Sequence, residues 1–339
     1  MYYIGSRFRR EGEKSYPACV CYMESKDGIH WDRPNLGVEF EETTETNILF
    51  KGMEDFNPFI DTNPNTKPEE RYKATCVYRM FSLFAWSSPD GIHWSPMKNG
   101  DAVFTDGRFD SQNVAFWSEA EGRYVLYFRD ARRDARDVGR AVSDDFIEWH
   151  RDGFIEFPLE EEGEGPRVLG QFYTNQIQPY YRAPKTIIGF PARYSDRGLT
   201  ASAKLLPEQE ERRERGVYET RFATAVTDSI YITSRDGKNF YQSPDVFLKP
   251  GLKTKHNWGY GDNYIARGIL ETESTFDDAP REMTLYATES RFTGRDTFWR
   301  RYTLRLDGFA SLAAESKEGF VETKPFIFEG TELSLNAST

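Results

Sequence analysis

A short turn phrase recurs five times along this chain, and it constrains the fold more than any single residue does. Two copies are nearly identical, SKDGIHW at 25–31 and SPDGIHW at 88–94, and looser copies stand at 143–149, 234–240 and 305–309. An Asp-Gly pair between β-branched and aromatic runs is a strong hairpin signal, because Asp tolerates the turn and Gly adopts positive φ without a Cβ penalty. The copies are spaced by about 55 to 90 residues, a period that indicates propeller blades.

Short runs that are rich in β-branched and aromatic residues surround each copy of the turn. Pairs of such runs precede it at 72–78 and 81–86, 124–128 and 138–142, 187–190 and 229–233, and 283–287 and 299–304. Ahead of each pair lies another apolar segment, the expected innermost strand, at 57–61, 109–117, 172–180 and 262–269. With a short outer strand such as 102–104, a unit has four strands and no room for crossover helices. The sequence therefore predicts an all-β chain that forms a five-bladed β-propeller with four-stranded antiparallel blades.

We expect one propeller domain over 1–339, with irregularities at three places. The chain opens on YYI at 2–4, which matches the second strand of the other units, so either the segment 324–339 closes the ring or the natural chain begins upstream. That segment is alternatively the start of a further C-terminal module. Residues 196–225 form a charged insertion within the fourth blade, with good helix formers at 205–215 and no apolar stripe. The insertion is either a solvated helix or loop, or a lid over the site.

Composition narrows the classes of partner and cofactor. The net charge of −11 argues against nucleic acid as a partner, because binding phosphates needs a cationic face. A neutral, hydroxyl-rich ligand is compatible with this charge. Cys19, Cys21 and Cys76 are too few and too irregular for a disulfide framework or a zinc site, so we expect no metal and no cofactor. No apolar run is long enough to span a membrane, and the first residues are not a signal peptide. We therefore expect a cytoplasmic protein that does not bind membranes, unless its natural start lies upstream.

Carboxylates on the innermost strands are the best candidates for chemistry. These strands line the central funnel of a propeller, and glycoside hydrolysis needs two or three carboxylates around one bond. Asp61 ends the segment 57–61 and Asp110 begins the segment 109–117, each beside polar residues that can orient it. We expect both to point into one funnel with carboxyl groups within about 10 Å of each other. Asp61, in DTNPN, also fits the cap of a turn.

These segments carry a resemblance to a known group of enzymes. The repeated turn after Tyr-rich strands resembles the five-bladed propellers of glycoside hydrolase families 32, 43 and 68 and their unclassified bacterial relatives. The segment FDSQNVAFW at 109–117 is similar to the Arg-Asp-Pro segment of the invertase family, which implies that Asp110 stabilises an oxocarbenium-like transition state. The segment NPFIDTNP at 57–64 resembles the strand that supplies the nucleophile or base, which implies that role for Asp61.

The third carboxylate of that family pattern is not matched. Where those families place a Glu acid, the next inner strand of this chain carries Gln176, and an amide cannot donate and recover a proton at pH 7. Glu289, after the strand that contains 285–288, is the substitute acid, with Asp262 behind it. An exposed Glu at a strand end is the other interpretation of Glu289.

Several further residues are expected to bind the substrate. Arg129 and Arg193 end matching strands of successive blades, where they hold sugar hydroxyls or a carboxylate, or else form ordinary ion pairs. Trp258 is a candidate for stacking on a sugar face, and His256 is a weak candidate for contact with a central ion. The expected substrate-binding set is completed by Asn113, Gln176 and Asp262.

The sequence thus favours a glycosidase that cleaves a terminal or furanose-like bond at the end of an oligo- or polysaccharide. One alternative is a non-catalytic carbohydrate-binding propeller, which Gln176 favours. The other is a sialidase-like hydrolase, because Ser-x-Asp-Gly-x-x-Trp resembles the sialidase Asp box. A sialidase needs three convergent arginines and a Tyr-Glu pair, which the sequence alone does not assemble. The sequence indicates no oligomeric state.

Overall fold

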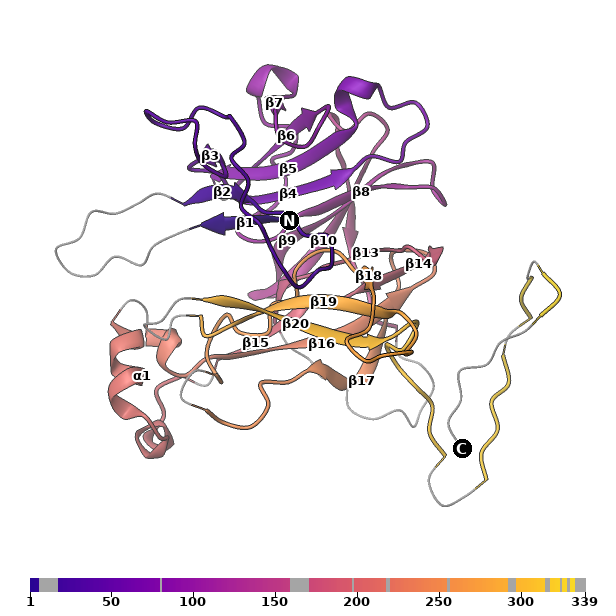
Figure 1. Ribbon diagram of the computed structural model, residues 1–339. Helices are drawn as coiled ribbons and strands as arrows, with labels where there is room; N and C mark the ends of the chain where they lie inside the picture. Colours follow the sequence, from indigo (N-terminus) through magenta and orange to yellow (C-terminus); the bar gives the residue numbers. More distant parts are fainter. Residues whose placement is uncertain are drawn as a thin grey trace. The chain divides into compact units, whose positions relative to one another are not determined.

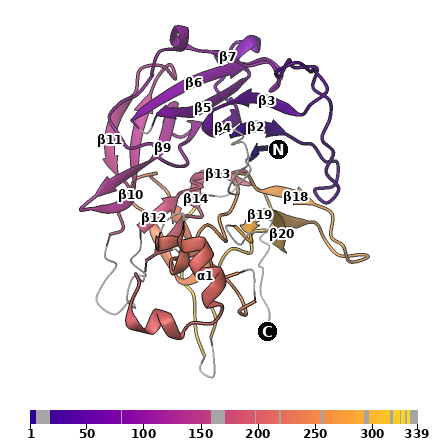
Figure 2. The same ribbon diagram turned by 90° about the vertical axis from the view of Figure 1, so that its left-hand side faces the viewer.

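The computed structural model describes residues 1–5, 18–79, 81–158, 171–196, 198–217, 220–254, 257–291, 297–314, 318–323, 325–327 and 330–332. The chain divides into two compact units, Met1–Asp307 and Gly308–Thr339. The described residues of the second unit contain no strand or helix. The first unit holds five antiparallel sheets that follow one another as the blades of a propeller (Figures 1 and 2). The predicted fold class is confirmed.

The first three blades follow the expected meander. The first contains β1 (Tyr2–Gly5), β2 (Cys19–Tyr22) and β3 (Ile48–Lys51). The second contains β4 (Glu54–Ile60), β5 (Tyr72–Arg79), β6 (Ser82–Ser88) and β7 (Ser95–Pro96). The third contains β8 (Val114–Ser118), β9 (Arg123–Arg132), β10 (Ala135–Ser143) and β11 (His150–Phe154). Because β1 and β2 precede a repeated turn as β5 and β6 do, the chain opens on a second strand, as predicted.

The last two blades are less regular. The fourth contains β12 (Gln171–Thr174), β13 (Gln178–Tyr180), β14 (Ala183–Gly189), β15 (Ala192–Ser195), β16 (Val226–Ser234) and β17 (Tyr241–Leu248). Both β14 and β15 pair with β16, so together they occupy the second strand position of the blade. The strands β12 and β13, which pair with β15 and β14, share the innermost position in the same way. The six strands therefore fill four strand positions, of which two are interrupted. The fifth contains β18 (Leu270–Thr272), β19 (Glu282–Glu289) and β20 (Phe298–Arg305), and a bridge between Ile265 and Ala287 extends its inner edge.

Helical segments are short and lie between strands. They are η1 (Pro68–Glu70), η2 (Lys98–Gly100), η3 (Ala201–Leu205), α1 (Gln209–Gly216) and η4 (Thr220–Ala223). The last three form the predicted charged insertion within the fourth blade. No helix in the described part of the chain is long and apolar enough to cross a membrane.

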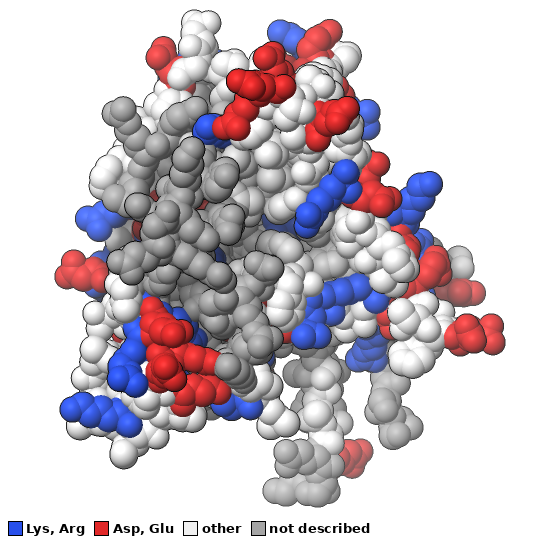
Figure 3. All heavy atoms as spheres, turned by 60° about the vertical axis from the view of Figure 1, so that its left-hand side comes forward, with Lys and Arg blue, Asp and Glu red and all other residues white. Residues whose placement is uncertain are grey.

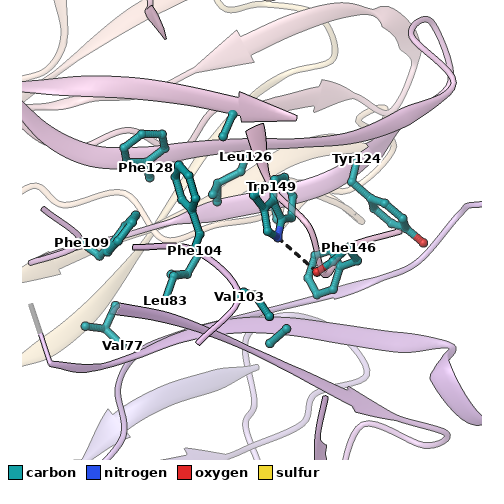
Figure 4. Packing of buried hydrophobic residues seen from close by; sticks show 13 residues of the cluster. Val77, Leu83, Val103, Phe104, Phe109, Tyr124, Leu126, Phe128, Phe146 and Trp149 are labelled. Carbon is teal, nitrogen blue, oxygen red and sulfur yellow. Dashed lines mark hydrogen bonds between the residues drawn. The ribbon is translucent and has the colours of Figure 1, made fainter. Parts of the chain in front are cut away.

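The repeated turns are built by their own side chains. Asp90 Oδ1 accepts hydrogen bonds from the backbone amides of Ile92 and His93, both at 2.8 Å, and Gly91 has a φ of 81°. In the third copy Phe146 occupies the glycine position with a φ of 69°, and its carbonyl accepts a 3.1 Å bond from Trp149 Nε1 (Figure 4). Phe146 and Trp149 also belong to the apolar core that joins the second and third blades (Figure 4). In both of these blades the turn joins the third and fourth strands, as predicted.

Tyrosines of one blade bond to the turn of the next blade and so fix the ring. Tyr2 donates to the Gly91 carbonyl at 2.9 Å, and Tyr127 donates to the Gly237 carbonyl at 2.7 Å. Tyr286 of the fifth blade donates to the carbonyl of Gly28 in the first blade. The Tyr286 ring also lies edge-on to Trp31, with centroids 5.5 Å apart. Contacts between the last and first blades therefore close the ring within the first unit.

Candidate functional site

Buried polar atoms without a hydrogen-bond partner gather in one region of the propeller. Eight buried side-chain atoms lack such a partner in the described part of the chain. Five of these eight lie near the starts of the inner strands of the third to fifth blades: Arg129 Nε, Arg136 Nε, Gln176 Oε1, Arg215 Nε and Tyr264 Oη. Native proteins satisfy nearly all buried polar groups, so such a cluster marks a place where a ligand or water completes the bonding. We take this region as the candidate site.

Tyr173 on β12 is the residue that joins the three blades. Its ring centroid is 5.7 Å from that of Tyr264 and 5.5 Å from that of Tyr260, both from the fifth blade. The guanidinium carbons of Arg129 and Arg136, from β9 and β10, lie 5.8 and 5.0 Å from the same ring centroid. Side chains separated by more than 100 residues in sequence thus meet around one aromatic ring.

Buried asparagines at the inner-strand starts hold these blades together. Asn175 Nδ2 donates to the carbonyls of Gln112 at 3.1 Å and Tyr127 at 3.2 Å in the third blade. Asn263 Nδ2 donates to the Thr227 carbonyl at 3.0 Å in the fourth blade. Hydrogen bonds that these side-chain amides donate therefore fix the positions of adjacent blades around the site.

Asn113 has the same structural task and is not placed to bind a substrate. It is fully buried, and its Nδ2 donates to the carbonyls of Phe109 at 3.1 Å and Ser111 at 2.5 Å. Its Oδ1 accepts the backbone amide of Arg129 at 3.1 Å. Asn113 consequently fixes the strand that carries Arg129.

Asp110, a predicted catalytic residue, lies beside Arg129 of the candidate site. It precedes β8, its side chain is 46% exposed, and its Oδ2 is 3.7 Å from Arg129 Nη2. Of the carboxylates considered for this site, it is the most open to solvent. The Asp110 carboxylate is therefore accessible to a ligand from solvent.

Asp61 lies at the other end of the inner strands. It follows β4, and its side chain has no exposure: Oδ2 accepts bonds from Lys73 Nζ at 2.5 Å, Tyr124 Oη at 2.7 Å and Thr66 Oγ1. Tyr124 pairs with Trp117 near the end of β8, whereas Asp110 precedes the start of that strand. The length of β8 alone contributes roughly 13 Å. The structure therefore does not bring Asp61 and Asp110 together, and it gives Asp61 a buried ion pair.

Asp262 is a buried carboxyl group in the fifth blade. It is 2% exposed, and it accepts the backbone amides of Arg291 at 3.0 Å and Gly259 at 3.2 Å. Burial raises its pKa to about 7, the nearby negative charge of Glu289 acts in the same direction, and Arg215 opposes them. Its proton is thus held at a pH where an ordinary Asp has none.

Glu289, the predicted acid, is held in the ionised form, in contrast to Asp262. Partial burial pushes its pKa up, but hydrogen bonds from Arg300 and Tyr302 outweigh burial, and the pKa is lowered. The Tyr302 hydroxyl donates to Glu289 Oε1 at 2.8 Å, which is a Tyr-Glu pair that the sequence did not reveal. Asp262 is consequently better suited than Glu289 to donate a proton.

The remaining predicted residues divide between the site and its surroundings. Gln176 is at the site, 2% exposed, with a φ of 48° and an unpartnered Oε1. Arg193 is held by Asp228 in a two-pronged ion pair at 2.9 and 2.5 Å, the alternative that the sequence left open. Trp258 donates from Nε1 to the carbonyl of Gly251 in its own loop, at 2.9 Å. His256 lies outside the described residues.

The charged insertion contributes an arginine to the site. Arg212 and Arg215 are the buried residues of α1. Arg212 Nη1 donates to the Ala223 carbonyl at 2.8 Å and holds the insertion together. Arg215 Nη1 lies against Gly259, where an added Cβ would stand 3.1 Å from it. The helix is therefore not wholly solvated, because it carries a cation toward Asp262, and the lid over the site stays a prediction.

Sequence reasoning missed Arg136, Tyr173, Tyr264 and Arg215. Their only sequence signal is an aromatic or arginine beside an inner-strand start, and that signal is common throughout this chain. No group of three or more His, Cys, Asp or Glu able to hold a metal is found among the described residues.

Comparisons with known proteins identify the fold. No family model matches the chain, and no curated protein matches it. A solved structure described as a glycoside hydrolase has a TM-score of 0.51 at 12% identity, covering 91% of this chain and 57% of that one. An N-acetylgalactosamine deacetylase from F. plautii, in complex with blood group B trisaccharide, has a TM-score of 0.50 at 15% identity, covering 85% and 80%. A fructofuranosidase from Schwanniomyces occidentalis has a TM-score of 0.44 at 13% identity, covering 80% and 46%. The predicted resemblance to five-bladed propeller hydrolases is confirmed for the fold, and the structural neighbours include both a glycoside hydrolase and a deacetylase that acts on a sugar.

Proposed function

We propose that this protein is a glycosidase whose chemistry takes place around Tyr173, with Asp262 as the proton donor and Asp110 as the second carboxyl group, facing the anomeric carbon. The observation that carries the proposal is the contrast between two neighbouring carboxyl groups of the fifth blade. The pKa of Asp262 is raised to about 7, and that of Glu289 is lowered. Environments that push two carboxyl pKa values apart are typical of acid and base assignments in enzymes.

Each residue has a defined task in this proposal. Asp262, in its protonated form, donates its proton to the departing glycosidic oxygen. A carboxyl group still carries a proton at pH 7 only when its pKa is raised. Asp110 acts as nucleophile or base, or stabilises the positive charge that develops on the sugar. Glu289 remains ionised beside Tyr302 and favours the protonated form of Asp262. Asp61 has no catalytic task, because Lys73, Thr66 and Tyr124 already occupy its carboxylate.

The test is a panel of aryl furanosides and pyranosides with good and poor leaving groups. Asp110→Asn should lower kcat on all of them, because its interaction is made mainly in the transition state. Asp262→Asn should lower kcat most for poor leaving groups, since an activated phenolate departs without a proton. Asp277→Asn is the matched control, because Asp277 is an exposed carboxylate of the same blade.

Three outcomes would contradict the proposal. Unchanged rates in both Asp110→Asn and Asp262→Asn would remove the assigned roles. Release of acetate from an N-acetylated sugar with an intact glycosidic bond would indicate amide hydrolysis. A wild-type protein that binds sugar and turns over no substrate would be a carbohydrate-binding propeller.

A sialidase-like hydrolase is the second candidate, and the 2.8 Å bond between Tyr302 and Glu289 favours it. A tyrosine nucleophile must lose its proton, however, and burial together with Glu289 raises the pKa of Tyr302. An aryl sialoside in the panel distinguishes the two candidates. Hydrolysis of that substrate with loss of activity in Tyr302→Phe would support the sialidase-like reaction over the one proposed.

A further inference from the structure

Two arginines of the site stand beside each other, with one described carboxylate, that of Asp110, within ion-pair distance of the pair. Arg129 and Arg136 both lie over the ring of Tyr173, at 5.8 and 5.0 Å from its centroid. Burial lowers the pKa of Arg129, and the positive charge of Arg136 lowers it further. Two like charges in a poorly solvated place destabilise one another unless an anion lies between them.

The described residues supply little negative charge to this pair. Arg136 Nη1 donates to the neutral amide oxygen of Gln171 at 2.5 Å, and no ion pair joins Arg136 to a described carboxylate. Arg129 has one carboxylate within reach, Asp110, at 3.7 Å and half exposed. Each guanidinium retains a buried Nε that has no partner. Donor capacity therefore remains on both arginines.

Other arginines on the same two strands are neutralised. Arg132 of β9 contacts Asp137 at 2.7 Å and Glu156 at 2.5 Å. Arg140 of β10 contacts Glu121 at 2.6 Å and also Asp152. On the face of the molecule shown in Figure 3, basic and acidic side chains are likewise interspersed. Among the described residues, the shortage of negative charge is thus a property of Arg129 and Arg136 and not of the other arginines on these strands.

We propose that Arg129 and Arg136 together bind the carboxylate of an acidic sugar, so that the substrate carries a uronic acid or a comparable sugar acid. This inference rests on the proposed function for the position of the sugar. Guanidinium groups present planar donors that match a carboxylate, and charge-assisted bonds of this kind are about twice as strong as neutral ones. Because the chain has a net charge of −11, an anionic sugar needs local positive charge of this sort to approach.

The test measures binding and needs no turnover. Methyl glucuronide and methyl galacturonide are compared with methyl glucoside and methyl galactoside by calorimetry on the full chain at pH 7 and low salt. The expected preference for the acidic member of each pair is about tenfold or more, the size of one or two charge-assisted bonds. Arg136→Gln should abolish the preference, and Arg136→Lys, which keeps the charge without the planar fork, should reduce it.

Arg133→Gln is the matched control, because Arg133 is exposed in the same hairpin and undergoes the same change of charge. It should leave the preference unchanged, and thermal unfolding verifies that each variant is folded. Equal affinity for acidic and neutral sugars, or a preference that survives in Arg136→Gln, would overturn the inference. Inorganic phosphate that competes as strongly as the uronide would also overturn it, since the pair would then bind a free oxyanion. A protein that binds uronides with this preference and hydrolyses no glycoside would refute the proposed function and leave the acidic-sugar site standing.

Discussion

The raised pKa of Asp262 makes the stability of the protein depend on pH, and this effect can be measured before any substrate is known. The folded-state pKa of about 7 exceeds the ordinary value of 3.8. The folded protein therefore binds more protons than the unfolded chain between these two values, and the free energy of unfolding falls as pH rises. The stabilisation is fully present below the unfolded-state pKa and is lost as pH rises through about 7.

The size of the effect follows from the shift. One pKa unit corresponds to about 1.4 kcal/mol, so Asp262 contributes at most about 4 kcal/mol, of which about 3 kcal/mol is lost between pH 5 and pH 8. Asp262→Asn keeps a side chain of the same shape that is neutral at both pH values. The wild type should consequently lose about 3 kcal/mol more than Asp262→Asn over this interval.

Urea unfolding followed by tryptophan fluorescence at pH 5 and pH 8 measures this difference. Asp277→Asn should behave as the wild type, because Asp277 is exposed. If the pH dependence of the wild type and Asp262→Asn is the same, Asp262 titrates normally and the argument for a protonated acid at this site fails.

Three further predictions address the activity, the buried ion pair and the closure of the ring. With a substrate in hand, kcat/KM should fall as pH rises through about 7, since Asp262 must be protonated. This fall should be absent from the pH profile of Asp262→Asn. A fall that persists in the variant would show that another group titrates. Lys73→Met should lower the free energy of unfolding by about 3–5 kcal/mol, because it leaves the charge of Asp61 buried and unpaired. The double variant Lys73→Met with Asp61→Asn should recover much of that loss. A Lys73→Met variant as stable as the wild type would contradict the importance of the ion pair. Tyr286→Phe removes the bond to Gly28 at the seam between the fifth and first blades and should cost about 1 kcal/mol in urea unfolding, whereas Tyr181→Phe, at an exposed tyrosine, should cost less; equal losses would argue against a special role for the seam.

The fold was predictable because its repeated unit is specified locally. An aspartate such as Asp90 accepts two amides within three residues of itself, so the turn forms from its own sequence wherever the phrase occurs. The position of Asp110 ahead of an inner strand was predictable for a related reason, since the repeated unit fixes where that strand begins, and its catalytic role stays a prediction.

The composition of the site depends on contacts between blades, which spacing along the chain does not encode. Asp61 follows β4 whereas Asp110 precedes β8, so the two carboxylates lie at opposite ends of the inner strands. Lys73, a cation within the β5 strand, was the signal that Asp61 has a structural partner. Arg136 lies at the start of β10, next to the hairpin turn, and has the sequence character of a loop residue; only the contact with Tyr173 marks it as a candidate site residue.

A structure of Asp262→Asn crystallised with an oligosaccharide that the wild type cleaves tests the central claim most directly. We expect the ligand to lie over Tyr173, with the glycosidic oxygen within hydrogen-bond distance of residue 262 and the anomeric carbon facing Asp110. A ligand bound beside Asp61, at the opposite end of the inner strands, would contradict this assignment of the active site.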